Sequence, residues 1–239
     1  MTLPKGRALL DAFLGINLIS GAEAKPISLS PDVWYGVTDD ITAGLVHSAV
    51  GSTGFIGGVA NSLCLTGTDN GCPKLYDNVG VDARYRLKTG NLAYAAEGGL
   101  YVLSFDPDFR LAVKLGLVGR WQQGKIAVEF APNLFVGATG RTIGEGDAAV
   151  TVNGETLNLP FTGLYEITPK ISAALQLGAV VPFEKTADAY RIPLSIGGHF
   201  AVNESIQVNL AFSLLAVAGG GSSTGFDART LTLGGTYAF

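Results

Sequence analysis

The stretch Val79–Leu87 reads Val-Gly-Val-Asp-Ala-Arg-Tyr-Arg-Leu, with apolar or aromatic side chains at odd positions and glycine or charge at even positions. Side chains of a β-strand point alternately to opposite faces, so this stretch predicts a strand with one apolar and one polar face. The same alternation recurs in Leu111–Trp121, Ile126–Val136 and Ile206–Ala216. A period of two therefore dominates the chain.

Twelve segments of this kind can be counted along the 239 residues, and most are 10 to 14 residues long. A tilted strand that crosses a bilayer needs about that length. The segments cover residues 6–19, 27–38, 41–50, 78–87, 92–103, 110–122, 126–137, 156–167, 170–182, 189–202, 205–217 and 228–239.

The connections between these segments alternate between tight turns and longer loops. Short turns at one end and long loops at the other are typical of transmembrane barrels. We therefore predict an all-β fold, a 12-stranded antiparallel up-and-down transmembrane β-barrel, as a single domain over 1–239 with both termini in the periplasm. The long connections around 51–77, 138–155 and 218–227 are then extracellular loops.

Composition favours this fold over a soluble β-sandwich or lipocalin-like barrel. The chain is 47% hydrophobic and only 15% charged, yet it has no run of about 18 to 20 apolar residues that could form a membrane-spanning helix. A soluble barrel would size its apolar face to fill one interior. Here most charges lie on the polar face, as expected when the apolar face meets lipid.

The N-terminal residues 1–24 resemble a signal peptide, with Lys5, Arg7 and an apolar stretch after them. Asp11 and Asn17 interrupt that stretch, however, and removing it would leave eleven strands, an odd number unsuited to a bacterial barrel. We therefore predict that it is the first strand.

Pro132 and Pro193 lie inside predicted strands and should mark bulges. Val150–Leu157, with an Asn-Gly turn, should form a hairpin above the membrane.

Aromatic residues test the fold independently, because their rings prefer the interface between membrane and water. Eight of them share the apolar parity and fall beside the short turns, which predicts a periplasmic aromatic girdle. They are Tyr35, Tyr85, Tyr94, Trp121, Tyr165, Phe200, Tyr237 and Phe239.

Cys64 and Cys72 are the two cysteines, with seven residues between them, in a stretch rich in Gly, Asn and Thr. They predict a disulfide that staples a loop in an oxidising compartment. The alternative is a pair of free thiols, and two sulfurs alone make a poor zinc site. The sequence thus predicts no metal and no cofactor, and its net charge of −4 without a basic patch argues against nucleic acid as a partner.

The final segment, Leu231-Thr-Leu-Gly-Gly-Thr-Tyr237-Ala-Phe239, alternates and ends in phenylalanine. It resembles the last strand of the bacterial outer-membrane β-barrel class. The stretch Trp34–Leu45 is similar to strand–turn–strand hairpins of porin-like members. The resemblance implies a location in the bacterial outer membrane, contact with its lipid, and recognition of the last strand by the barrel assembly machinery. It specifies the class and no solute.

An enzymatic function is an alternative, because twelve-stranded members of the class include a phospholipase with a lipid-facing His-x-Ser pair. His47 has the outward parity, but Ala49 stands where the serine would be. A surface protease needs acids and histidine together; Asp106, Asp108 and Asp147 are predicted at the rim without a lumen-facing histidine. We therefore predict that the protein is not an enzyme.

The inward face carries charges set in a wall of small residues. On strands four to seven, charges of opposite sign are predicted at similar depth, as a ladder. The predicted pore-lining residues are Arg7, Asp11, Asp82, Arg84, Arg86, Glu97, Arg110, Lys114, Arg120, Glu129, Glu166, Lys170, Arg191 and His199. With Lys5 and Asp32, the inward set holds nine basic and six acidic residues, a net charge of +3.

This pattern favours a narrow aqueous pore for passive diffusion of small solutes or ions with a mild anion preference, since charged rings set selectivity. The alternative is a non-conducting structural or surface-interaction barrel that acts through its extracellular loops; a hydrolase ranks below both. Twelve strands lie between filled and open barrels. The apolar, glycine-rich 51–62 segment could also plug the mouth.

Overall fold

The computed structural model describes residues 2–18, 26–48, 62–72, 74–106, 109–143, 150–151, 153–184, 186–220 and 229–239. Several predicted features lie outside the described residues. They are most of the 51–62 segment, parts of the predicted 138–155 and 218–227 loops (144–149, 152 and 221–227), the signal-like 19–24, Ala49, Asp108 and Asp147.

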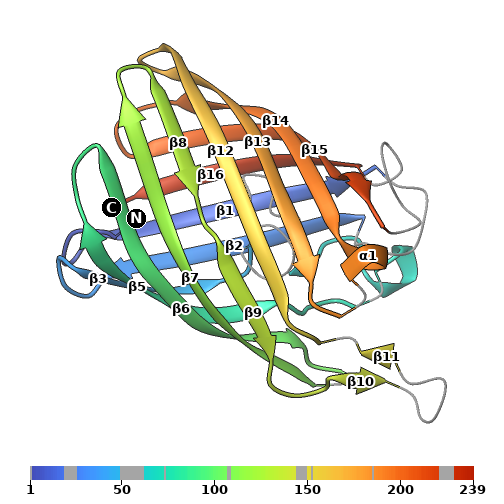
Figure 1. The fold of residues 1–239 in the computed structure, drawn as a ribbon. Helices are drawn as coiled ribbons and strands as arrows, with labels where there is room; N and C mark the ends of the chain where they lie inside the picture. Colours follow the sequence, from blue (N-terminus) through green and yellow to red (C-terminus); the bar gives the residue numbers. More distant parts are fainter. Residues whose placement is uncertain are drawn as a thin grey trace.

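The chain is almost entirely strand (Figure 1). The strands are β1 (Ala8–Asn17), β2 (Ile27–Gly36), β3 (Ile41–Val46), β4 (Leu63–Cys64), β5 (Val79–Lys88), β6 (Leu92–Ser104), β7 (Arg110–Gln123), β8 (Ile126–Phe130), β9 (Asn133–Gly137), β10 (Thr142–Ile143), β11 (Val150–Thr151), β12 (Thr156–Thr168), β13 (Ile171–Pro182), β14 (Arg191–Ala201), β15 (Ile206–Gly219) and β16 (Arg229–Ala238). Two single turns, η1 (Thr68–Asn70) and α1 (Thr186–Ala189), interrupt them. Among the described residues, no helix has the length and hydropathy to cross a membrane.

The sheet closes on itself, because β1 pairs antiparallel with both β2 and β16. At the seam, the Ala8 amide donates to the Phe239 carbonyl (2.8 Å) and the Phe239 amide donates to the Ala8 carbonyl (3.0 Å). Counting β8 and β9 as one interrupted strand and setting aside the short β4, β10 and β11, twelve antiparallel strands form the barrel. The predicted fold class is confirmed, and the signal-like N-terminus supplies part of the wall.

The two ends of the barrel differ. Turns at 37–40, 89–91, 124–125, 169–170 and 202–205 define what we call the short-turn rim, where both chain ends lie side by side (Figure 1). The opposite end, which we call the long-loop rim, carries α1, the β10–β11 hairpin and the disulfide.

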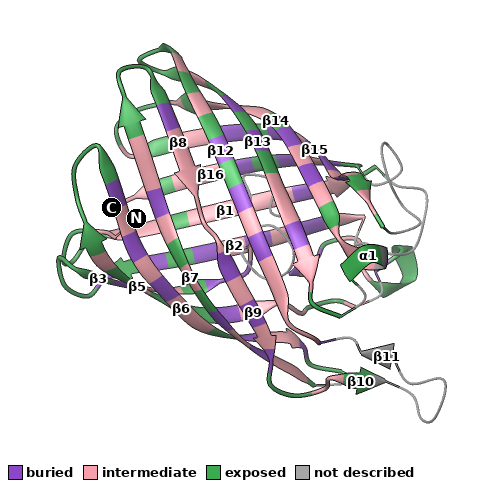
Figure 2. Ribbon diagram, viewed as in Figure 1, coloured by how far each residue is buried: buried purple, intermediate pink, exposed green. Residues whose placement is uncertain are grey.

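Burial alternates along most of the long strands, though not along β1, where nearly all residues are half-buried (Figure 2). Outward side chains such as Val81, Leu100 and Leu115 are 63%, 56% and 58% exposed, while their sequence neighbours Asp82, Tyr101 and Lys114 are buried inside the barrel. An exterior of exposed leucine, valine and isoleucine on every side fits contact with lipid.

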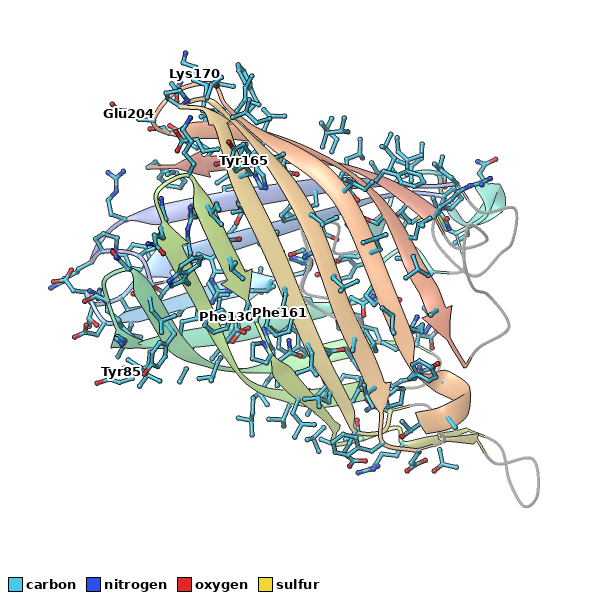
Figure 3. The ribbon with its side chains drawn as sticks, turned by 45° about the horizontal axis from the view of Figure 1, so that its top comes forward. Tyr85, Phe130, Phe161, Tyr165, Lys170 and Glu204 are labelled. Atoms are coloured by element: carbon cyan, nitrogen blue, oxygen red, sulfur yellow. A yellow bond between two sulfur atoms is a disulfide. The ribbon has the colours of Figure 1, made fainter. Side chains whose placement is uncertain are left out.

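Aromatic residues gather near both rims of this exterior. Of the predicted girdle, Tyr35, Tyr85, Tyr165, Phe200, Tyr237 and Phe239 are exposed near the short-turn rim, whereas Tyr94 and Trp121 are half-buried. Tyr85 and Tyr165 are labelled on the outside of the barrel in Figure 3. Toward the long-loop rim, Tyr76 stacks on Phe105 with 5.7 Å between ring centroids, and Phe109 and Phe183 are also exposed.

The third strand is shorter than predicted, because β3 ends at Val46 and not at residue 50. The cause is Asp32, whose carboxylate accepts the backbone amides of His47 (2.7 Å) and Ser48 (2.9 Å) in place of a β2 carbonyl. The outer half of β2 pairs with β4 instead, at Ser28 and Leu29.

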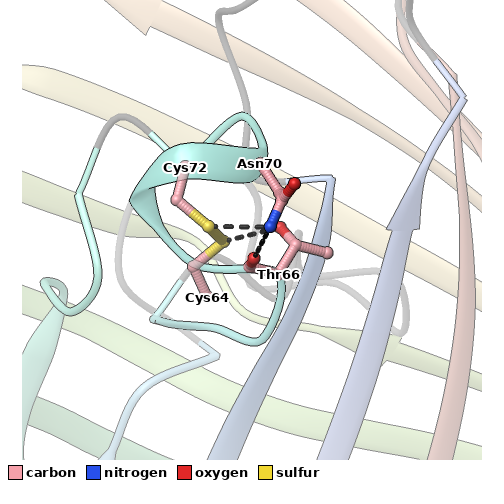
Figure 4. The surroundings of a disulfide bond; sticks show 4 residues. All are labelled: Cys64, Thr66, Asn70 and Cys72. Carbon is pink, nitrogen blue, oxygen red and sulfur yellow. Dashed lines mark hydrogen bonds between the residues drawn. A yellow bond between two sulfur atoms is a disulfide. The ribbon is translucent and has the colours of Figure 1, made fainter.

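The predicted disulfide is confirmed: Cys64 and Cys72 are joined, with 6.2 Å between their Cα atoms (Figure 4). Thr66 lies beside both sulfurs, and the Asn70 amide donates to the Thr66 carbonyl at 3.1 Å. The bridge therefore closes a loop directly onto β4, the segment that pairs with β2.

The prolines act differently from one another. Pro193 coincides with a register shift between Ile192 and Leu194, as predicted for a bulge. At Pro132 the prediction of a bulge is wrong: the strand breaks between β8 and β9, but both neighbours keep their register across the break.

The hairpin predicted over 150–157 is also misplaced. It is formed by β10 and β11, while the Asn153 side chain donates to the Leu111 carbonyl at 3.0 Å and anchors the loop.

Candidate pore interior

A buried ion-pair network fills one side of the interior. On β5, β6 and β7, the Lys114 ammonium lies 2.9 Å from Asp82 and 2.8 Å from Glu97, and Arg84 lies 2.9 Å from Glu97. The side chains of Lys114, Asp82 and Glu97 are at most 3% exposed. Charges this deep are tolerated only when paired and hydrogen-bonded.

Aromatic rings cover this network from the lumen. The Arg84 guanidinium stacks 3.7 Å from the centre of the Trp34 ring, and the Tyr101 hydroxyl donates to Asp82 at 2.5 Å. Phe135 meets Tyr101 edge-on, with 5.2 Å between ring centroids. We call Trp34, Tyr101 and Phe135 with the four charged residues the interior block.

Glycines on neighbouring strands make room for two of these rings. Gly44 is the register partner of Trp34 and Gly80 that of Tyr101. A Cβ built at Gly80 would overlap the Tyr101 ring, and one built at Gly44 would come 2.5 Å from the Trp34 ring. The rings can therefore lie against the wall only because these two positions have no side chain.

The expected wall of small polar side chains is thus wrong for this side of the barrel. Trp34, Tyr101 and Phe135 stand at the inward parity of their strands, so alternation was the signal that could have located them. The expected charge ladder also divides. Arg84, Glu97, Lys114 and Asp82 are connected, whereas Glu129 pairs separately with Arg120 at 3.0 Å.

The segment before β1 turns into the short-turn mouth. The Leu3 amide donates to the Thr42 hydroxyl (2.7 Å), the Lys5 amide donates to the Asp39 carboxylate (3.0 Å), and Arg86 donates to the Thr2 hydroxyl (3.0 Å). Leu3 also packs against the hydrophobic cluster around Trp34. Residues 2–6 therefore narrow this mouth on the side of β3 and β5.

The opposite side of the interior is lined by polar side chains. Residues that are register partners on neighbouring strands point these side chains inward, in a line from the long-loop end of β16 to the short-turn end of β7. We call this set the polar row: Thr230, Ser213, Ser195, Gln176, Thr162, Glu129 and Arg120. Since the strands of a closed barrel tilt, one register line crosses the wall obliquely and reaches both ends.

Beside the polar row lies a cavity of about 330 Å³. Four side chains that line it, Arg120, Gln176, His199 and Asn209, each keep a buried nitrogen or oxygen with no hydrogen-bond partner among the described residues. Buried polar atoms are nearly always satisfied by protein or by ordered water. These four atoms are themselves almost inaccessible, so the polarity of the cavity comes from its charged and polar lining, which suits water or a polar solute.

The predicted pore-lining residues occupy three regions. Arg7 and Lys170 are exposed and Glu166 and Arg86 half-buried at the short-turn rim, and Lys170 is labelled on a turn in Figure 3. Arg110 and Arg191 begin β7 and β14 at the long-loop rim. Asp11, Arg120, Glu129 and His199 line the cavity together with Arg84, the one charged residue of the interior block that reaches it, whereas Asp82, Glu97 and Lys114 lie deeper in that block.

Comparison with solved structures agrees with this architecture. The NanC porin aligns over 95% of this chain and 98% of its own at 11% identity, with a TM-score of 0.60. An outer-membrane channel from Pseudomonas putida F1 aligns over 100% and 97% at 15% identity, with a TM-score of 0.62. The chain has the fold of an outer-membrane β-barrel. A bacterial polysaccharide outer-membrane secretin aligns over 99% of both chains at 13% identity, with a TM-score of 0.52. No family model and no curated protein matches the sequence.

In this outer-membrane barrel, His47 is placed differently from the lipid-facing position expected for it. It is 6% exposed, its Nδ1 contacts the Pro31 carbonyl, and its Nε2 lies 2.9 Å from the Tyr76 hydroxyl. A histidine packed this way orders the end of β3. Within the described part of the chain, no three His, Cys, Asp or Glu side chains gather as a metal site requires.

Proposed function

We propose that the protein is a bacterial outer-membrane channel for passive diffusion of small solutes or ions, with a mild anion preference. The observation that carries this proposal is the polar row beside a cavity lined by charged and polar side chains. A barrel filled to hold its shape alone would need no such space. The polar row runs between the two rims and supports a water-filled path alongside the interior block.

The anion preference rests on the short-turn rim. Five basic residues are exposed there (Lys5, Arg7, Lys88, Lys125 and Lys170) against three exposed acidic ones (Asp39, Asp40 and Glu204). Deeper inside, Glu97 and Asp82 are ion-paired, and Asp11 and Asp32 accept hydrogen bonds from Thr236 and Ser48. The expected excess of positive charge is therefore proposed for the mouth and not for the middle of the lumen.

Planar-bilayer recording in a KCl gradient tests the channel and its selectivity together. We expect chloride to be favoured over potassium by roughly twofold, because an excess of one charge at a mouth biases ion entry. A variant with Lys5→Gln, Arg7→Gln and Lys170→Gln should bring the reversal potential toward zero. Lys74→Gln, near the long-loop rim, is the matched control. A clear cation preference would refute the anion proposal, and absence of current from folded barrel would refute the channel.

We further propose that the short-turn rim and both termini face the periplasm, with β16 read by the barrel assembly machinery. Tight turns on the periplasmic side and longer loops outside are general in such barrels. Single cysteines introduced at Asp69, near the long-loop rim, and at Lys170, on a short turn, test this in a Cys64→Ser/Cys72→Ser background. A membrane-impermeant maleimide should label only the Asp69→Cys barrel on intact cells, and labelling of Lys170→Cys alone would invert the orientation.

The interior block supports a second candidate, a non-conducting barrel that acts through its extracellular loops. Aromatic rings and buried ion pairs occupy one side of the interior, and residues 2–6 narrow one mouth. The same recording separates the two functions. A barrel that is folded and silent in the bilayer supports this candidate.

A further inference from the structure

An open groove crosses the outer surface of the barrel over β13 to β16, with a volume of about 470 Å³. Gly198 of β14 lies at its floor, between Ile196 and Phe200 of the same strand. Leu210 and Phe212 of β15 form one side. These five residues share the outward parity of their strands, so the groove is part of the apolar exterior.

The polar residues at this groove do not make it polar. His199 and Asn209 also border it, but both are inward residues whose side chains line the interior cavity. Only their backbone therefore faces outward. An occupant of the groove meets glycine backbone and apolar side chains.

Gly198 is an outward glycine whose space the protein leaves open. Among the described atoms, a Cβ built there would meet only the Ser172 carbonyl oxygen, at 3.2 Å. At Gly119, another outward glycine, a Cβ would overlap the ring of its register partner Phe130. The protein fills one hollow with its own ring and leaves the other empty. A hollow in a wall facing hydrocarbon loses van der Waals contacts unless a molecule from outside fills it.

The groove begins at the short-turn rim and extends toward the middle of the wall. Ile171 and Phe200 are register partners at the rim end. Phe200 and Ile196 are four positions apart on β14, which corresponds to about 13 Å along the strand. Leu231 of β16 borders the far end beside its partner Phe212. An apolar groove that starts at the rim and ends inside the wall suits an extended hydrocarbon chain.

A basic residue lies at the rim end of the groove. Lys170 directly precedes Ile171 and is exposed, and its carbonyl accepts the Ala201 amide at 2.8 Å, which holds the turn beside Phe200. Figure 3 shows Lys170 at the turn end of the barrel, with Glu204 on the next turn. A lysine at this level attracts an anionic lipid headgroup. Because Glu204 is also exposed, the preference for negative charge should be modest.

We infer that the groove binds one acyl chain of a phospholipid whose phosphate lies beside Lys170. The groove is continuous with the lipid-facing exterior, so a phospholipid reaches it without leaving the membrane. Since lipid tails are as apolar as leucine, close packing in the hollow holds the chain, and exclusion from water does not. The inference goes beyond the proposed channel, and it holds whether or not the barrel conducts.

Native mass spectrometry of the full chain, released from detergent micelles that contain phosphatidylglycerol, tests the site. We expect the parent barrel to retain one phospholipid. Gly198→Leu should retain it about tenfold less often, because its side chain fills the hollow and loses the lipid about ten carbon–carbon contacts. Gly163→Leu is the matched control. Gly163 is an outward glycine of β12 away from the groove, and a Cβ there would lie 3.7 Å from the nearest atom, so retention should match the parent.

A second variant removes one side of the groove without adding bulk. Phe200→Ala should also lower retention, whereas Tyr85→Ala, which removes an exposed ring on β5, should not. Heat-modifiable migration on a gel verifies that each variant is folded. Equal retention by the groove variants and their controls would overturn the site. A dimer without bound lipid, dissociated by Gly198→Leu, would overturn it in favour of a second copy of the chain.

The headgroup is tested by competition between phosphatidylglycerol and zwitterionic phosphatidylcholine. The parent should prefer phosphatidylglycerol, and Lys170→Gln should reduce this preference by up to about fivefold, the usual effect of one lysine near anionic lipid. Lys88→Gln, at an exposed position of β5 away from the groove, should leave it unchanged. Equal retention of the two lipids by the parent would overturn the placement of the phosphate beside Lys170. None of these results depends on current, so the channel proposal stands or falls separately in the bilayer recording.

Discussion

Replacing Lys114 by methionine should lower the free energy of unfolding by about 3 to 5 kcal/mol, the usual effect of removing one partner of a buried ion pair. The substitution preserves much of the side-chain volume but removes the cation that Asp82 and Glu97 share. Two carboxylates then remain in a region almost closed to water, with Arg84 bound to only one of them. Urea unfolding in phospholipid vesicles, followed by tryptophan fluorescence, measures the change.

Arg141→Met is the control for this experiment. Arg141 lies 2.8 Å from Glu155 near the long-loop rim, and both side chains are partly exposed. Ion pairs in contact with water contribute about 1 kcal/mol or less, so this variant should unfold close to the parent. Equal destabilisation by the two substitutions would show that burial does not set the strength of the Lys114 pairs.

Replacing Trp34 by alanine should increase the single-channel conductance by roughly twofold, because lumen width and lining control ion passage. Trp34 covers the Arg84 guanidinium of the interior block and lines the cavity directly. Its removal joins the vacated space to the cavity and leaves Arg84 without its aromatic cover. Recording in symmetric KCl measures the effect on barrels that migrate as folded.

The second tryptophan provides the matched control, since Trp121 has the outward parity near the short-turn rim. Trp121→Ala should leave conductance within experimental scatter of the parent value. If Trp34→Ala conducts like the parent, the current does not pass beside Trp34, and the proposed path along the cavity is wrong.

Alternation alone predicts the strand count, the closure of β1 on β16 and the direction of most side chains. It succeeds because contact with lipid requires apolar residues on one face of every strand. Val79–Leu87 and Ile206–Ala216 therefore show the same alternation, although they lie far apart in the sequence. The same rule kept residues 8–17 in the wall despite their likeness to a signal peptide.

At the end of β3, alternation predicts a longer strand than the structure has, because a local hydrogen bond ends the strand pairing. His47 and Ser48 continue the alternation, but the Asp32 carboxylate competes successfully for their amides. A carboxylate fifteen residues away leaves no periodic trace in the sequence. At Pro132, by contrast, the sequence predicts an irregularity larger than the one observed. Proline lacks a backbone hydrogen-bond donor, but here the strand only breaks, without a shift in register.

The four charges of the interior block are predicted to face inward, but its three aromatic residues are not predicted, because inward positions are free of the constraint that lipid imposes. Trp34 and Tyr101 are placed by glycines on neighbouring strands, and register between strands cannot be derived from one strand alone. Likewise, the polar row combines serines and threonines with Gln176 and the Glu129–Arg120 pair, none of which is unusual on an inward face. Their alignment becomes visible only when seven of them are joined through the strand pairing.

The pairing of β4 with the outer half of β2 has a consequence for how the barrel is made. Backbone groups of Ser28 and Leu29 meet a partner that is tied back by the Cys64–Cys72 bond. A wall facing hydrocarbon must satisfy all its backbone groups, and bacterial disulfides form in the periplasm. In the proposed outer-membrane location, thiol oxidation during export would therefore hold β4 in place for this pairing, so that one short section of the barrel edge depends on a covalent bond.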